Sequence, residues 1–320
     1  MPRLSLLTPL PMKRPVTVVV MASFARVHPS TAIISETILS LRLLQLPRRT
    51  PVLVAHNGPP IVDTEFPPSY LEYLTRVRNL LPRFAQCTGF ALQLVLRSSD
   101  SGYGRNIEFA LSFVRTPFVL KVEHDHFFTR RLDVLSIVRD MLDDTRIKMV
   151  RFNRRRNERV KCDDGDSVPE PWRLRKRAQM LWYAHRITAN RTHLRNVYTR
   201  TACWSDINHL ARTDYYRDEI FPLVVRDAAR TPEVHMNKFV VFNHSRFGTF
   251  VYGGPGASPT VVHADAAWNG HGERVEKVLS WVQNLIDNER GNNESSRTFS
   301  EEPPFACLRT FRWLGVEPGQ

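Results

Sequence analysis

Short apolar runs recur along the first half of the chain, and segments with helical spacing lie between them. The first run, at residues 16–21, is continuous and rich in β-branched residues, which is typical of a strand buried on both faces of a sheet. Similar runs occupy residues 51–55, 90–96, 118–122 and 147–152. Helical patterns begin near residue 30 and cover residues 69–85, 105–114 and 132–143. This alternation predicts an α/β fold over residues 15–152, with a mostly parallel central sheet flanked by helices.

The rest of the chain has a less regular pattern. Residues 1–14 look like a loose leader, and residues 153–285 are expected to complete the same domain. In that second half the pattern predicts a helix near 213–225, strands near 238–243, 248–252 and 260–264, and a final amphipathic helix at 269–285. Residues 286–320 are expected to form a flexible linker and a C-terminal tail, because their first part is polar and rich in Gly, Asn and Ser.

The charge of the chain indicates a negatively charged partner. Its 320 residues include 45 Lys and Arg against 32 Asp and Glu, which gives a formal net charge of +13. Nucleic acid, an anionic membrane surface and phosphorylated small molecules all fit this charge. No apolar stretch approaches the roughly 20 residues of a membrane span. The sequence therefore predicts a soluble cytoplasmic protein. Its basic surface could make peripheral contact with a membrane.

The four cysteines contain no CxxC pair, so their spacing does not favour a zinc site. In a chain of this length, scattered cysteines are typical of free thiols in a reducing compartment.

Two carboxylates and two imidazoles follow the fourth apolar run directly, in the order Glu123, His124, Asp125 and His126. Ligands bind at the carboxyl ends of strands in such sheets, and carboxylate oxygens suit Mg²⁺ and Mn²⁺. Glu123 and Asp125 are two residues apart, so on an extended chain they would point the same way and hold one ion between them. The alternative is a solvated turn.

Two other segments carry candidate binding residues. Arg105 and Asn106 open a predicted helix after Gly104, where free N–H groups and the helix dipole favour a phosphate; the alternative is an ordinary helix start. Further along, Trp204 and Asp206 could form a sugar-binding wall, because aromatic faces stack on pyranose rings. The alternative places Trp204 in the core and makes Asp206 a helix cap.

Residues 118–125 resemble the strand and D-x-D signature of glycosyltransferases with the Rossmann-like GT-A fold, with Glu123 in place of the first Asp. Residues 16–26 resemble the opening strand and loop of the family-2-type enzymes, and the resemblance covers roughly residues 15–130.

This resemblance implies a Mn²⁺ or Mg²⁺ ion held by Asp125, Glu123 and a late histidine. His263 is the candidate for this histidine, and the alternative is that His263 is structural. His124 and His126 are expected to shape the site. The nucleotide contacts that it implies fall on Ser23, Arg26, Asn57, Arg105, Asn106 and Glu123.

The resemblance also implies an activity. The chain is expected to move a sugar, with inversion, from a nucleoside-diphosphate sugar, favoured as a UDP sugar, to a glycan or another hydroxyl acceptor. Such a transfer needs a carboxylate base across the sugar from the diphosphate. Glu233, at the start of a predicted helix, is the first candidate for this base, and Asp206 is the second.

Two other functions remain open at this stage. The net charge of +13 favours a nucleic-acid-binding protein, but no binding motif or aromatic-interleaved basic platform occurs, so nucleic acid is not the favoured partner. A nucleotidyltransferase would share the metal carboxylates, but the chain has no glycine-rich triphosphate signature near the first strand.

Overall fold

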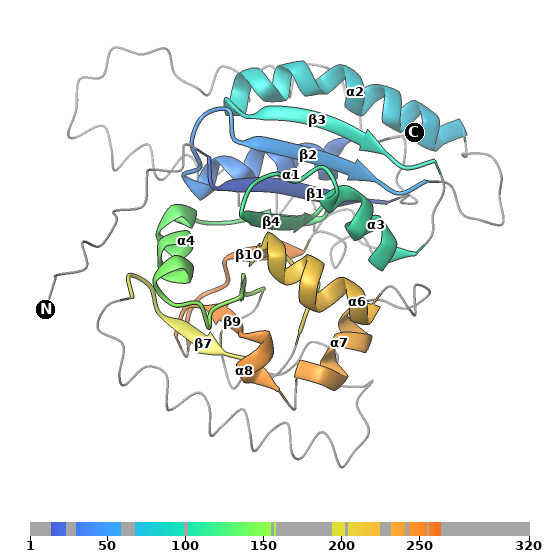
Figure 1. Ribbon diagram of the computed structural model, residues 1–320. Coiled ribbons are helices and arrows are strands. Elements are labelled where there is room, and N and C mark those ends of the chain that lie inside the picture. Colours follow the sequence, from blue (N-terminus) through green and yellow to red (C-terminus); the bar gives the residue numbers. More distant parts are fainter. Residues whose placement is uncertain are drawn as a thin grey trace, which may run out of the picture.

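The computed structural model shows the chain as a layered α/β protein (Figure 1). The residues that it describes are 14–23, 30–58, 68–98, 102–154, 157, 194–201, 204–224, 232–240, 243–254 and 256–263. Residues 1–13 of the predicted leader, the predicted helix at 269–285, and the linker and tail at 286–320 lie outside the described residues, as does Arg26.

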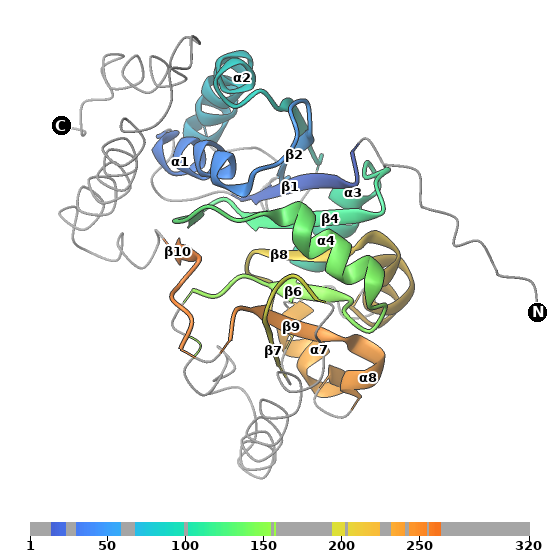
Figure 2. The same cartoon turned by 90° about the vertical axis from the view of Figure 1, so that its left-hand side faces the viewer.

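An eight-stranded sheet forms the centre of the molecule, in the order β3-β2-β1-β4-β8-β6-β9-β7. Its strands, in that order, are β3 (Ala91–Leu96), β2 (Pro51–His56), β1 (Val16–Ala22), β4 (Phe118–Glu123), β8 (His209–Arg212), β6 (Met149–Arg151), β9 (Thr249–Tyr252) and β7 (Tyr198–Arg200). The first four are parallel to one another. β8 runs antiparallel to both β4 and β6, β9 is parallel to β6, and β7 is antiparallel to β9. Figure 2 shows this succession from β2 to β9.

Helices cover both faces of the sheet. Those on one face are α1 (Ala32–Ser40), η1 (Leu41–Leu44), α2 (Pro68–Thr88) and α4 (Val134–Asp143). Those on the other face are α3 (Tyr103–Leu111), the π-helix η2 (Tyr215–Ile220), α6 (Phe221–Val224), α7 (Pro232–Val240) and α8 (His244–Phe247). None of the described helices combines the length and the apolar character that a membrane span requires.

The unbroken β-branched run in β1 is explained by its place in the middle of the sheet. Val18 and Val20 belong to one hydrophobic core, and Val19 and Met21 to the other. Side chains alternate between the faces of a strand, so a strand covered on both sides needs apolar residues at every position. All seven residues of β1 are buried.

The predicted α/β class, with a central sheet flanked by helices, is confirmed, and each of the five predicted strands in residues 15–152 has a counterpart. A strand that was not predicted, β8, lies between β4 and β6 and makes this part of the sheet antiparallel. The strand predicted near 238–243 is wrong, because α7 continues to Val240. Met236 and Val240 are four residues apart and both lie in the second core, which is a helical spacing.

A small second sheet lies outside the large one. It pairs β5 (His126–Phe128) with β10 (Val261–His263) in antiparallel register. This pairing brings a segment near the end of the described chain beside the end of β4 (Figure 2).

Cys87, near the end of α2, is disulfide-bonded. Free thiols were predicted for all the cysteines, and for Cys87 this prediction is wrong. It used spacing along the chain, which does not show which cysteines meet in space. The prediction of a reducing compartment rested on free thiols, so the disulfide at Cys87 removes that support.

Asp140 is a fully buried carboxylate that joins α4 to the segment leading into β7. It accepts hydrogen bonds from the backbone N–H groups of Arg195 at 2.8 Å and Asn196 at 3.0 Å. The side chains of Asn196 and Tyr198 donate to its Oδ2 at 2.8 and 2.7 Å. A buried carboxylate with this many donors fixes the position of the edge strand.

We expect Asp140→Asn to lower the free energy of unfolding by about 3 kcal/mol, because an amide cannot accept at both of its terminal atoms and buried donors lose their partner. The matched control is Asp143→Asn on the same helix, whose side chain is 48% exposed and pairs with Arg195 at 2.8 Å. Exposed pairs contribute little, so its loss should be much smaller. Urea unfolding measures both, and equal losses would contradict the anchoring role of Asp140.

Candidate functional site

The carboxyl ends of β1, β2, β3 and β4 lie together at one edge of the sheet. Backbone hydrogen bonds connect the segments that follow these strands: Asn57 N donates to Ala22 O at 3.1 Å, and His124 N donates to Met21 O at 3.0 Å. Arg97 N donates to His56 O at 3.2 Å. The edge at which open α/β sheets bind ligands is therefore formed by residues just after four neighbouring strands.

Asn208 holds the chain where β4 becomes β5. Glu123 is the last residue of β4, His124 and Asp125 form a turn, and β5 begins at His126. The Asn208 side chain accepts from Glu123 N at 2.8 Å and donates to His126 O at 3.1 Å, so it connects the two sides of the turn. On the other side, the Thr37 hydroxyl donates to His124 O. Because of this turn, the chain is not extended between Glu123 and Asp125, and the expectation that they point the same way does not hold.

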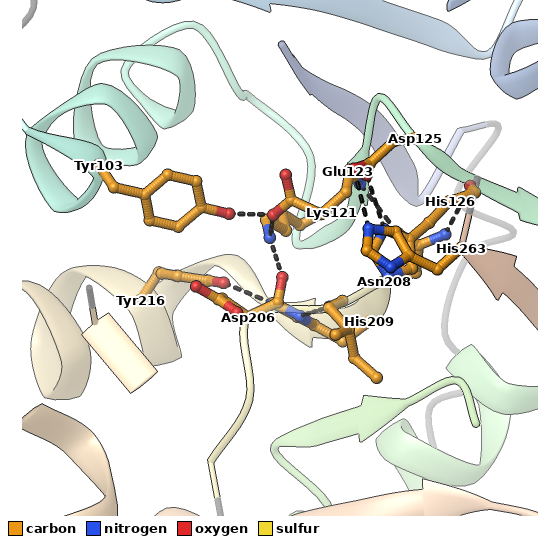
Figure 3. Close-up of polar contacts among 11 residues, drawn as sticks. Tyr103, Lys121, Glu123, Asp125, His126, Asp206, Asn208, His209, Tyr216 and His263 are labelled. Atoms are coloured by element: carbon orange, nitrogen blue, oxygen red, sulfur yellow. Dashed lines mark hydrogen bonds and ion pairs between the residues drawn. The ribbon is translucent and has the colours of Figure 1, made fainter. Parts of the chain in front are cut away.

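Asp125 contacts two histidines. Its Oδ1 accepts from His126 Nδ1 at 2.8 Å, and its Oδ2 accepts from His263 Nε2 at 3.0 Å (Figure 3). His126 and His263 are register partners in the β5–β10 pair, and their rings stack with centroids 4.4 Å apart. The ligand atoms of these three residues all lie within 4.8 Å of one another. The structure thus brings the predicted Asp125 and His263 together, and it adds His126.

The histidines determine the charge state of the carboxylate. Burial by itself raises the pKa of Asp125, but the hydrogen bonds from His126 and His263 and the nearby charges of His124 and His126 outweigh it. The pKa of Asp125 is therefore held well below its ordinary value. An ionised, partly buried carboxylate between two imidazoles is a fitting donor set for a divalent cation.

Glu123 has different partners. Its Oε1 accepts from the Lys121 ammonium and from the Tyr103 hydroxyl (Figure 3). Lys121 is 0% exposed, and its Nζ lies 5.2 Å from the centre of the Tyr103 ring. Burial, and then the charge of Glu123, raise the pKa of Tyr103, so its hydroxyl stays protonated as the donor. Glu123 thus neutralises a buried lysine, whereas the sequence assigned it to the metal.

The same lysine reaches the segment that precedes β8. Lys121 Nζ also donates to the backbone carbonyl of Asp206. His209 is fully buried; its Nδ1 lies 2.6 Å from Ile207 O, and its Nε2 contacts the Tyr216 hydroxyl. Burial, and then the charge of Lys121, lower the pKa of His209, so this histidine is neutral. Since a carbonyl only accepts, Nδ1 carries the proton and Nε2 accepts from Tyr216.

Trp204 is fully buried in the second core and stands edge-on to His209, with ring centroids 5.9 Å apart. The sequence offered a sugar-binding wall or a core residue, and the structure shows the core residue. Asp206 is half-buried, and its charge contributes to raising the pKa of Tyr103 and Tyr216. Its carboxylate therefore belongs to the neighbourhood of Glu123.

The remaining predicted residues surround α3. Gly102 precedes this helix with φ 89°, a backbone conformation that favours glycine. Arg105 is exposed on the first turn, whereas Asn106 is buried and its Oδ1 accepts from Arg97 Nη1 at 3.2 Å. A Cβ on Gly104 would lie 2.8 Å from Val224 Cγ1 and 3.7 Å from Pro232 Cγ, so α3 and α7 begin close together.

The structure also describes three further residues that the sequence predicted for the site. Glu233 is half-buried on the first turn of α7, which begins beside the start of α3. Ser23 follows β1 directly. Asn57 follows β2, and its buried Oδ1 has no hydrogen-bond partner among the described residues.

The roles of Lys121 and Asn208 were not predicted from the sequence. A signal for Lys121 was present, because a charged residue inside an otherwise apolar buried strand requires a partner. No signal marked Asn208, because its contacts with Glu123 and His126 span more than 80 residues of chain.

No family model matches the chain, and no curated protein matches it. Similar solved structures include residues 1–349 of S. aureus TarS, with a TM-score of 0.43 and 16% identity, covering 78% of this chain and 60% of that chain. The same TarS segment in complex with UDP-GlcNAc has a TM-score of 0.40 and 13% identity, covering 85% and 66%. This chain therefore spans about 60% of the length of the first TarS structure. At these TM-scores the likeness assigns neither an activity nor a substrate.

We expect Lys121→Met and Glu123→Gln each to lower the free energy of unfolding by about 3 kcal/mol, because each leaves the other charge without its partner in a buried setting. The double variant should lose less than the sum of the two, with a coupling of about 1–3 kcal/mol in urea unfolding.

The control cycle uses Arg76→Met and Glu72→Gln, an exposed pair one turn apart on α2, for which we expect a much smaller coupling. Strictly additive losses at Lys121 and Glu123 would contradict the buried pairing.

Proposed function

We propose that this chain is a GT-A-type glycosyltransferase that moves a sugar from a nucleoside-diphosphate sugar, of the UDP type, to a hydroxyl acceptor with the help of a divalent cation. One observation carries the proposal. Asp125 and His263 are 138 residues apart in the chain, yet they meet directly after β4, in the segment that resembles the D-x-D signature. This is the edge of the sheet at which a diphosphate and its cation would bind.

The residues present fit a divalent cation. Asp125 supplies an ionised carboxylate, and imidazole nitrogens lie beside it. Mn²⁺ and Mg²⁺ are the ions proposed from the sequence. A bound ion would offset the negative charge that develops on the departing diphosphate. Glu123 could contribute only by giving up its bonds to Lys121 and Tyr103, which makes it the weakest of the three ligands proposed from the sequence.

The same edge offers groups for the nucleotide. The Oδ1 atom of Asn57 is buried and has no partner among the described residues, so it can accept a hydrogen bond from a base. Arg105 is exposed on the first turn of α3, where the helix dipole and the guanidinium both favour phosphate. Ser23 and Arg26 are proposed as donor contacts on the family resemblance.

The transfer needs a base for the acceptor proton. The acceptor oxygen would bond to the anomeric carbon as the bond from that carbon to the diphosphate oxygen breaks, and the nucleoside diphosphate leaves. The acceptor proton would pass to a carboxylate on the opposite side of the sugar, with inversion. Asp206 lies in the neighbourhood of Glu123, and Glu233 lies on the first turn of α7 beside the start of α3. Both remain candidates.

The proposed function predicts metal-dependent nucleotide binding. UDP should raise the unfolding temperature of the protein in the presence of Mn²⁺ and much less without it, because a ligand stabilises the state that binds it. Asp125→Ala should remove this stabilisation and lower sugar transfer by roughly 100-fold or more.

The matched control is Asp218→Ala, an exposed carboxylate on η2. Its response to UDP and Mn²⁺ should equal that of the wild type. A UDP shift that is independent of metal, or that survives Asp125→Ala, would overturn the proposal.

A separate experiment identifies the base. Glu233→Gln and Asp206→Asn should both keep the metal-dependent UDP shift, and the variant that lacks the base should lose roughly 100-fold or more in kcat. Turnover near the wild-type level in both variants would exclude both residues as the base.

A further inference from the structure

The segment between α7 and α8 carries a sequence to which N-linked glycans are attached. Asn243, His244 and Ser245 form an N-x-S sequon with a residue other than proline in the middle. Two further sequons, at Asn190 and Asn293, lie outside the described residues. A motif this short is common by chance, so the sequence alone assigns no modification. At Asn243 the structure adds its exposure, its hydrogen bonds and its distance from the candidate site.

Asn243 lies on the surface of the molecule. Its backbone N–H donates to Phe239 O at 3.1 Å, so it continues the last turn of α7. Asn243 and Ser245 are both exposed, and the neighbouring Arg246 side chain is 50% exposed. An N-linked glycan is bulky and solvated, so it requires a surface position of this kind.

The hydrogen bonds of Asn243 leave its amide nitrogen available. Its Oδ1 accepts from Ser245 Oγ at 3.0 Å and from the backbone N–H of Arg246 at 3.2 Å, which caps the start of α8. Its Nδ2 has no partner among the described residues. An amide offers its oxygen as the acceptor and its nitrogen as the donor, so a glycan on Nδ2 leaves both bonds to Oδ1 in place.

The disulfide at Cys87 is an independent indication of the compartment. Disulfides form and persist in oxidising compartments such as the lumen of the endoplasmic reticulum, and they are rare where thiols are kept reduced. N-linked glycans are attached to proteins that enter the same secretory route. The disulfide and the exposed sequon therefore point to the same environment.

We propose that Asn243 is an N-glycosylation site. The co-reactant is an oligosaccharide linked to a lipid diphosphate in the secretory pathway. The bond from the anomeric carbon to the diphosphate oxygen breaks, and that carbon bonds to Nδ2 of Asn243. The amide loses one proton, and the lipid diphosphate leaves with the electron pair of the broken bond.

A glycan at this position lies away from the candidate site. α8 leads through Gly248 into β9, so Asn243 lies near the amino end of β9. β9 is parallel to β6, and β6 and β4 are both antiparallel to β8, so β9 runs in the same direction as β4. The candidate site follows the carboxyl end of β4, at the opposite edge of the sheet, where β10 lies (Figure 2). The inference is therefore independent of the proposed function.

The direct test is peptide mapping of the full chain purified from its native cells. Trypsin cleaves after Lys238 and Arg246 and releases residues 239–246, which contain this one sequon. We expect this peptide to carry the mass of a glycan, and peptide-N-glycosidase should remove the glycan and convert Asn243 to aspartate. Recovery of the peptide only in its unmodified form would overturn the inference.

Variants of the full chain, directed by an added signal sequence into the secretory pathway of a eukaryotic host, test the two parts of the sequon. Asn243→Asp keeps an oxygen that caps α8 but removes the nitrogen, and Ser245→Ala keeps the nitrogen but removes the hydroxyl. Each should lower the glycosylated fraction of peptide 239–246 at least roughly tenfold.

The matched control is Ser245→Thr, which retains a hydroxyl and completes the N-x-T form of the sequon. Its glycosylated fraction should equal or exceed that of the wild type. An unchanged fraction in Ser245→Ala, or a loss in Ser245→Thr as large as that in Ser245→Ala, would contradict the assignment of Asn243.

Discussion

The turn at His124 and Asp125 is the constraint on which the candidate site depends. It ends β4 at Glu123 and starts β5 at His126, and it is held by the Asn208 side chain on one side and the Thr37 hydroxyl on the other. A continued strand would have set the two carboxylates on one face. The turn instead directs Glu123 toward Lys121 and Asp125 toward the histidines of the small sheet, so adjacent polar residues have different physical roles.

Two neighbourhoods at the end of β4, one around Lys121 and one around Asp125, differ in their charge. Around Lys121, a buried ammonium needs a counter-charge, and Glu123, Tyr103 and the Asp206 carbonyl satisfy it within the protein. Around Asp125, two imidazoles hold the carboxylate ionised, but the Nε2 atom of His126 has no partner among the described residues. The first neighbourhood is therefore complete without a ligand and links β4 to the segment before β8. We propose that the second receives a cation.

Local patterns were enough to predict the strands and helices of the first half of the fold, because β1 and its neighbours are covered on both faces and need continuous apolar runs. The strand β8 could not be predicted in the same way. It has only four residues, it begins with His209 and ends with Arg212, and its place between β4 and β6 is decided by pairing with residues far away in the chain. The resemblance to a known family was enough to propose Asp125 and His263. The contacts of His126 with both of them depend on the β5–β10 register, which pairs residues far apart in the chain.

The most direct test of the account is anomalous diffraction from crystals grown with Mn²⁺ and UDP. The account predicts one strong manganese peak in contact with Asp125 and His263, with the diphosphate of UDP bound to the ion at the carboxyl edge of β4. A manganese peak on Glu123 away from the histidines would contradict the assignment of the ligands. UDP bound away from this edge, or no manganese between Asp125 and His263, would contradict the account as a whole.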